Sequence, residues 1–175
     1  MNKINSNSIS LAGEFAVLSQ LALRGYDANM TLGNTKGVDI LVSDPMSGKM
    51  YQLEVKTTCE RSTRSKISTS KIHGKTLSGW IMMKKHETMT SPTLFYCFVN
   101  ISKDTDNFKF YIVPSKVVAK YVKEQHKLWL DAKKVEGKKV KNTDMRLFRI
   151  GLNSEEYAIP TPSAEKYENN WRFNM

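Results

Sequence analysis

Two short segments of the chain carry acidic and basic side chains at spacings that suit the hydrolysis of a phosphate ester. Asp39 stands in the first segment, and Glu54 and Lys56 stand two residues apart in the second, just after Gln52. Successive side chains of a β-strand point to opposite faces, so Gln52, Glu54 and Lys56 share one face if this segment is a strand. One face of that strand is therefore a candidate site.

The turn that joins the two segments predicts which residues face each other. It is centred between Met46 and Ser47, and counting outward from that centre in an antiparallel hairpin without a bulge sets Asp39 opposite Glu54. Directly opposed residues have Cβ atoms about 5 Å apart on the same side of a sheet. Two carboxylates and the ammonium of Lys56 are thus expected to share one small patch.

Like charges opposite each other destabilise a sheet, and a bound cation would resolve the conflict. Mg²⁺, or Mn²⁺ in its place, takes carboxylate oxygens, keeps several waters and activates water for attack on a phosphodiester. We expect Asp39 and Glu54 to bind the metal, with the backbone carbonyl of Val55 as a further ligand. Lys56 is expected to stabilise developing phosphate charge or to orient the attacking water.

A third carboxylate, Glu14, is expected on a helix that packs against these strands. From Ser10 to Gly25 apolar residues recur at helical spacing, with Ser8 or Ser10 as the N-cap and Gly25 as the terminator. The expected apolar face consists of Leu11, Phe15, Leu18, Leu21 and Ala22. Glu14 falls on this face, so its carboxylate needs a partner there, such as Lys56 or a metal-bound water.

The order of these residues resembles a known group of proteins. A helix with Gly13-Glu14, then Gly37-Val38-Asp39, then Glu54-Val55-Lys56 looks like the PD-(D/E)XK nuclease superfamily, which includes many restriction endonucleases and archaeal Holliday-junction resolvases. The resemblance covers roughly residues 10–60, and Val38 replaces the proline that precedes the motif aspartate.

The resemblance implies an α/β fold with a restriction-endonuclease-like αβββαβ core that binds Mg²⁺. By the same resemblance Asp39, Glu54 and Lys56 take the motif positions, and Glu14 takes the helix acid that a subset of the family carries. Residues 94–132 are expected to complete the core, in which helices flank a mixed central sheet.

The remaining elements follow from periodicity and turn residues. Strands are expected near 27–31, 38–42, 50–58, 94–101, 108–113 and 145–150, with a hairpin between the fourth and fifth. A helix should start with Pro114 at its first position and run to about Ala132, with a lysine-rich side expected to be a solvated face, and a terminal helix is expected over 163–171. Residues 60–75 read as a long basic loop, and 80–85 fits a short helix or a strand.

Basic residues after the second segment are candidates for contacts with phosphates that flank a scissile bond. They are Arg61, Arg64, Lys66, Lys71, Lys75, Lys84 and Lys85. The alternative for most of them is a solvated loop. Gln52 and His86 are possible accessory residues, although a lone histidine beside lysines is more often an ordinary surface residue.

Composition limits the classes of protein to which the chain can belong. Its 175 residues, 40% hydrophobic, suit a single folded domain, with a motif core at about 10–132 and a final strand and helix at 145–175. The 27 basic residues against 17 acidic ones leave a net charge of +10, which fits an anionic partner such as nucleic acid or a membrane surface. Two cysteines without metal-ligand spacing disfavour a disulfide scaffold and a zinc site. We expect a cytoplasmic protein with no membrane-spanning segment.

These observations favour a Mg²⁺-dependent endonuclease that hydrolyses DNA with metal-activated water. The alternatives are a non-catalytic nucleic-acid-binding module that retains the fold, and a structural subunit of a larger assembly. The alternating strand 51–57 could also be an ordinary half-exposed strand. Three tryptophans are expected in the core or in subunit contacts, so a homodimer stays open: Trp80, Trp129 and Trp171.

Overall fold

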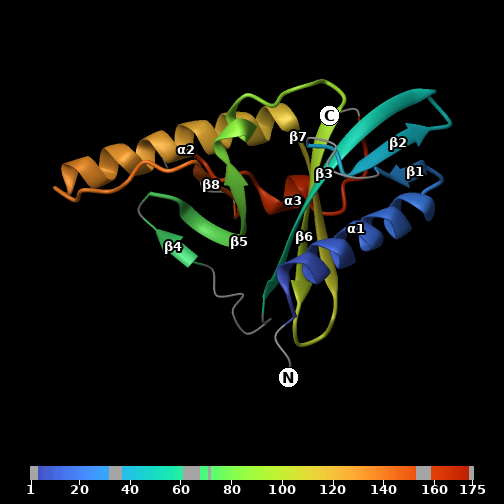
Figure 1. The fold of residues 1–175 in the computed structure, drawn as a ribbon, viewed down its shortest axis with the longest axis horizontal. Helices are drawn as coiled ribbons and strands as arrows, with labels where there is room; N and C mark the ends of the chain where they lie inside the picture. Colours follow the sequence, from blue (N-terminus) through green and yellow to red (C-terminus); the bar gives the residue numbers. More distant parts are fainter. Residues whose placement is uncertain (1–3, 32–36, 61–67, 71, 153–158, 174–175) are drawn as a thin grey trace.

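The computed structural model describes residues 4–31, 37–60, 68–70, 72–152 and 159–173 as a mixed α/β structure (Figure 1). Its central sheet has the strand order β1-β2-β3-β6-β7, in which only β3 and β6 run parallel. The strands of this sheet are β1 Asp27–Met30, β2 Ile40–Asp44, β3 Lys49–Glu60, β6 Leu94–Ser102 and β7 Phe108–Pro114.

A second, smaller sheet and four helical segments complete the described structure. The sheet has the order β4-β5-β8, with β4 Ser68–Ser70, β5 Gly74–Met83 and β8 Met145–Gly151. The helices are α1 Ser6–Ala22, α2 Ser115–Val135 and the short α3 Ala164–Tyr167, and a 3₁₀ turn, η2, spans Lys84–Glu87. No helix among the described residues is both long and apolar enough to cross a membrane.

The middle of the central sheet, around β3 and β6, is covered on both faces. On one face Val17 and Leu21 of α1 pack with sheet residues such as Leu53 and Phe95. On the other face β5, β8 and α2 supply the core, with Phe98 of β6 in contact with Trp80 and Phe148. The alternation of β3 explains this arrangement, because Leu53 and Val55 point toward α1 while Glu54 and Lys56 point to the other face.

The hairpin register predicted from the turn is confirmed. The β2–β3 pairs run from Asp44 with Lys49 to Ile40 with Leu53, which is the pairing expected from a turn centred between Met46 and Ser47. The Asp44 carboxylate fixes this turn, because it accepts hydrogen bonds from the Met46 N–H at 3.0 Å and from the Ser47 hydroxyl at 2.6 Å.

The helix α1 differs from the prediction in its first residue and in the face that it turns toward the sheet. It starts at Ser6, because Asn5 acts as the N-cap and accepts a hydrogen bond from the Ser8 N–H at 2.8 Å. Leu11 and Phe15, predicted to face the sheet, are 46% and 56% exposed. The buried side instead contains Gly13, Val17 and Leu21. Gly13 determines this orientation, since a Cβ at this position would collide with Thr57 Oγ1 of β3.

Other elements follow the predictions in part. The β6–β7 hairpin and β8 are confirmed, and α2 begins at Ser115, with Pro114 as its N-cap, and continues past Ala132 to Val135. The predicted loop over 60–75 contains β4 and the start of β5, and 80–85 is the end of β5 followed by η2. The terminal helix predicted over 163–171 has only four residues, because the chain turns to extended structure at Glu168.

Candidate active site

Glu54 lies in the middle of the central sheet and is the most buried carboxylate of the site. Its side chain is 2% exposed, and Oε1 accepts hydrogen bonds from Lys56 Nζ at 2.7 Å and from His86 Nε2 at 3.0 Å. Burial by itself would raise the pKa of Glu54, but the His86 hydrogen bond and the Lys56 charge outweigh it and hold this pKa at about 2. Glu54 is therefore ionised at neutral pH.

The second carboxylate oxygen of Glu54, Oε2, is buried, and so is the hydroxyl of Tyr96, the β6 partner of Glu54. Burial, the Glu54 charge and a hydrogen bond to Glu54 raise the pKa of this phenol. On another side stands Gly37, where a Cβ would lie 3.4 Å from Oε2. A buried anionic oxygen is costly unless a donor or a cation compensates its charge, so Oε2 is suited to the Tyr96 hydroxyl or to a cation.

His86 is a buried part of this site, and the expectation of an ordinary surface histidine is wrong. It is 1% exposed and sits on η2, where its Nδ1 lies 2.9 Å from both the N and the O of Met83. An ionised carboxylate only accepts hydrogen bonds, so Nε2 carries the proton that His86 donates to Glu54. The 3₁₀ turn thus holds the orientation of Glu54 from outside the hairpin.

Asp39 directly precedes β2, and its carboxylate lies against the backbone of β3 next to Glu54. Its Oδ2 accepts a hydrogen bond from the Val55 N–H at 2.6 Å, and its own N–H donates to the Leu53 carbonyl at 2.8 Å. Burial raises the pKa of Asp39 and the Glu54 charge adds to this effect, whereas the Val55 hydrogen bond and the Lys56 and Lys85 charges oppose it. In the protein without metal, Asp39 therefore ionises less readily than a free aspartate.

Glu14 comes close to this group from α1. It is half-buried, next to the Gly13 contact with β3, and burial raises its pKa, with a further increase from Asp39 and an opposing effect from Lys56. The charges of Asp39 and Lys56 thus act on Glu14, and Lys56 forms an ion pair with Glu54. Within the described ranges no three His, Cys, Asp or Glu side chains are clustered tightly enough to hold a metal ion together.

The predicted DNA-contacting residues are placed in different parts of the molecule. Lys84 and Lys85 are exposed on η2, and the Lys85 charge acts on Asp39. Lys75 is exposed near the start of β5, eight residues from Met83 and so roughly 26 Å along the strand from the end that leads into η2. Gln52 is exposed on β3. The other predicted contacts lie outside the described residues: Arg61, Arg64, Lys66 and Lys71.

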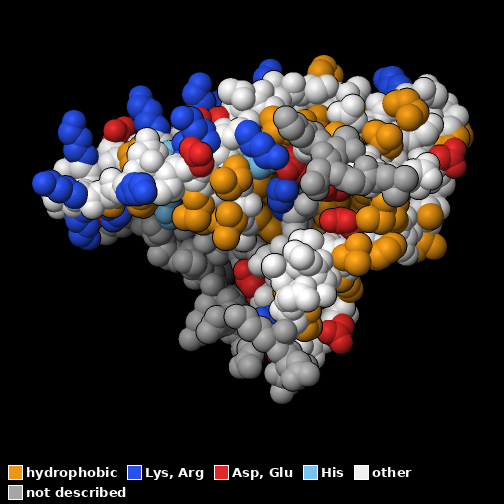
Figure 2. Space-filling model, in the orientation of Figure 1, with side chains coloured by type: hydrophobic (Ala, Val, Ile, Leu, Met, Phe, Trp, Pro, Cys, Tyr) orange, Lys and Arg blue, Asp and Glu red, His pale blue; other side chains and the backbone are white. Residues whose placement is uncertain are grey.

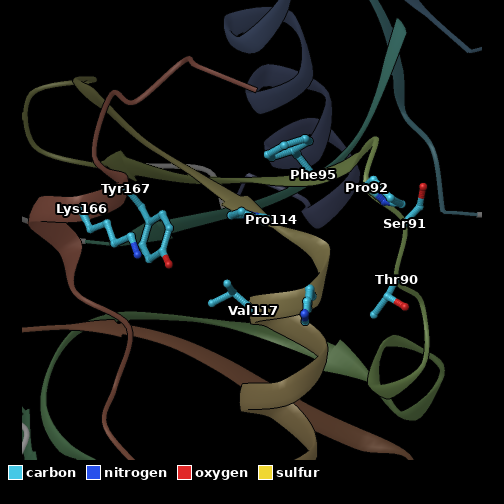
Figure 3. A pocket seen from close by; sticks show the side chains of 9 residues that line it. Thr90, Ser91, Pro92, Phe95, Pro114, Val117, Lys166 and Tyr167 are labelled. Atoms are coloured by element: carbon cyan, nitrogen blue, oxygen red, sulfur yellow. The ribbon is translucent and has the colours of Figure 1, made fainter. Parts of the chain in front are cut away.

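A cavity of about 400 Å³ opens beside Lys56, between α1, β3 and β5. Its lining is Ser10, Val55, Lys56, Thr57, Thr58, Gly79, Trp80 and Ile81. A larger pocket of about 510 Å³ lies elsewhere, where Pro114 and Val117 at the start of α2 meet Tyr167 and Phe95 (Figure 3). None of the three site carboxylates lines this second pocket, and neither does Lys56, so the space that adjoins the charged group is the smaller cavity.

Comparisons with known proteins inform the fold. A scan against protein-family models finds no match, and a search of curated proteins finds no relative. Among solved structures, the bacterial homing endonuclease I-Ssp6803I is similar, with a TM-score of 0.51 over 97% of this chain and 90% of that chain, at 11% sequence identity. At this identity the likeness concerns the fold alone. The chain therefore shares its overall fold with a homing endonuclease.

Proposed function

We propose that the chain is a Mg²⁺-dependent endonuclease that hydrolyses phosphodiester bonds in DNA, built on the αβββαβ core of the PD-(D/E)XK superfamily. The observation that carries the proposal is the grouping of three charged side chains at one end of the β2–β3 hairpin: Asp39 accepts a hydrogen bond from the Val55 N–H, and Glu54 on β3 pairs with Lys56. The fold shared with a homing endonuclease supports DNA as the substrate. The order of α1 and three antiparallel strands, followed by the parallel β6, supports this core in part. Where the core has its second helix, the described chain has β4, β5 and η2, and α2 follows only after β7.

The residues present fit a hard divalent cation, because two carboxylates and carbonyl oxygens are the ligands that Mg²⁺ prefers. Asp39 and Glu54 would hold it, with the Val55 carbonyl as a further ligand and Glu14 in an outer position. When bound, Mg²⁺ supplies Lewis-acid polarisation of the phosphate and a lowered pKa for water. Mn²⁺ should be able to replace Mg²⁺ at this site.

The protein's own groups then have distinct tasks. The Val55 N–H holds Asp39 in place, and the His86 Nε2–H holds Glu54 ionised and fixed in orientation. The Lys56 ammonium lies 2.7 Å from Glu54 Oε1, and Lys56 is part of the cavity lining. From there it donates to the phosphate as negative charge develops, which stabilises the transition state more than the ground state.

A second candidate function is a non-catalytic nucleic-acid-binding module. It is favoured by the net charge of +10 together with the lack of a cluster of three or more acidic, His or Cys side chains among the described residues. Divalent metal distinguishes the two functions, because only the nuclease requires it.

The test is a titration of Mg²⁺ and of Mn²⁺ with supercoiled plasmid and purified protein, with EDTA as the metal-free control. We expect nicked and linear products that increase with metal and disappear in EDTA, and calorimetry should detect binding of the cation to the protein alone. Retarded DNA without cleavage in either metal would instead support the binding module.

Lys56→Met is expected to lower the cleavage rate by roughly 10²–10³-fold, the usual effect of removing a donor that stabilises developing charge. Metal binding should be largely retained, because Glu54 keeps its hydrogen bond from His86. Single-turnover cleavage and calorimetry measure the two effects separately. Lys49→Met, at the exposed start of the same strand, is the matched control and should cleave at the wild-type rate. A Lys56→Met protein with normal cleavage would remove this lysine from the mechanism.

A further inference from the structure

The exposed side of α2 carries a row of lysines that the proposed active site does not use. We call it the α2 lysine row, and it consists of Lys116, Lys120, Lys123, Lys127 and Lys134, all exposed. Steps of three, four and seven residues keep these side chains on one face of the helix. The opposite face is buried, with Val118, Tyr121 and Val122 in the core. The sequence predicted only a solvated face here.

The row is not neutralised within the described part of the chain. None of its five lysines forms an ion pair with a described acidic residue, although Glu124 and Asp131 lie on the same side of the helix. Residues 115–144 contain nine lysines against four acidic residues, which leaves +5, half of the net charge of the chain. A concentrated positive surface of this kind binds polyanions.

The helix that carries the α2 lysine row packs against the segment that reaches the candidate active site. The helix packs against η2, which carries the exposed Lys84 and Lys85 and the buried His86 that holds Glu54. The Lys85 charge acts on Asp39, so positive groups extend from the carboxylates across η2 and along α2. Figure 2 shows Lys and Arg side chains gathered along α2, from its far end toward the centre of the molecule.

The dimensions of the row fit a nucleic-acid duplex. From Lys116 to Lys134 the helix rises about 27 Å, which equals the length of about eight base pairs at 3.4 Å each. Steps of four residues set neighbouring lysines about 6 Å apart along the helix axis, close enough to reach successive phosphates of one strand. The distal part of α2 lies beyond Gln125, its last buried residue, and projects past the strands (Figure 1).

We infer that the α2 lysine row binds the phosphates of the DNA duplex on one side of the scissile bond. The inference takes its ligand from the proposed function. A membrane surface is a poorer match, because interfacial helices need a free apolar face and that of α2 is buried in the core.

The test compares two variants with the same loss of charge. One is Lys120→Gln/Lys123→Gln/Lys127→Gln on α2, and the control is Lys49→Gln/Lys103→Gln/Lys109→Gln, at exposed positions on the β2–β3 and β6–β7 hairpins. Affinity for a labelled duplex is measured by anisotropy in EDTA over a range of salt concentrations. The α2 variant should lose about tenfold or more in affinity at ~0.1 M salt, and its slope of log K against log salt should fall by about 2.7, or 0.9 per contact. The control should keep the wild-type slope.

Equal losses in the two variants, or no binding of duplex by the wild type, would overturn the inference. A third outcome would also overturn it: the α2 variant loses the wild-type affinity for anionic vesicles but keeps the wild-type affinity for DNA. Metal-dependent cleavage is measured in parallel at saturating protein. Cleavage with an unchanged salt slope in the α2 variant would reject the DNA surface and leave the nuclease in place. A reduced salt slope in the α2 variant, with no cleavage by the wild type, would support the DNA surface and reject the nuclease.

Discussion

Asp39→Asn is expected to abolish Mg²⁺-dependent cleavage while the protein stays folded. Asparagine keeps an oxygen for the hydrogen bond from the Val55 N–H, so the local backbone should not change. It removes one of the two anionic groups proposed to hold the metal, and metal chemistry contributes several kcal/mol to such reactions. At 1.36 kcal/mol per tenfold change, we expect a rate at least ~10³-fold lower.

Asp27→Asn makes the same chemical change on the exposed start of β1 and serves as the matched control. Both variants are purified identically to exclude contaminating nucleases, and circular dichroism checks that each is folded. Equal cleavage by wild type and Asp39→Asn would show that this carboxylate holds no catalytic metal.

The hairpin part of the site was predictable because its geometry is local in sequence. The turn between β2 and β3 is fixed by the Asp44 side chain a few residues away, and once the turn is set, strand alternation places Glu54 and Lys56 on one face and brings Asp39 opposite this part of β3. Two short-range rules, the turn centre and the period of two, are sufficient for this pairing.

The partners of Glu54 were not predictable in this way, because they depend on how distant segments meet. His86 reaches Glu54 only because β5 is a strand that brings η2 back over β3, and the sequence over 80–85 left helix and strand open. Tyr96 depends on the parallel register of β3 and β6, which no short turn sets.

The predicted orientation of α1 was wrong for a different physical reason. Counting apolar residues favours a face with Leu11 and Phe15, whereas the helix in fact approaches β3 through Gly13, a residue that contributes almost no hydrophobicity. Where a helix approaches a strand this closely, only glycine fits at the contact position, because it has no side chain. Glu14 still reaches the site because it directly follows the contact residue.

The two carboxylates should respond in opposite ways when their charge is removed from the metal-free protein. The pKa of Glu54 is lowered to about 2 in the folded state, so the folded protein favours its ionised form. The stability from Glu54 is therefore present above its ordinary pKa of 4.5 and is lost as the pH falls toward 2. The shift corresponds to about 3 kcal/mol at 1.36 kcal/mol per pH unit. The pKa of Asp39 is raised instead, so its ionisation costs stability as the pH rises.

In EDTA at pH 7, Glu54→Gln should therefore lower the free energy of unfolding by about 3 kcal/mol, because the donors from Lys56 and His86 then face a neutral amide. Asp39→Asn should raise it. Urea titrations measure both, and repeating them toward pH 2.5 should shrink the Glu54→Gln difference as the wild type gains a proton. Mg²⁺ at 100 times its dissociation constant should add about 2.7 kcal/mol to the wild type and little to either variant. If both substitutions destabilise the protein equally in EDTA, and Mg²⁺ has no effect on the wild type, the two carboxylates form a structural pair and not a metal site.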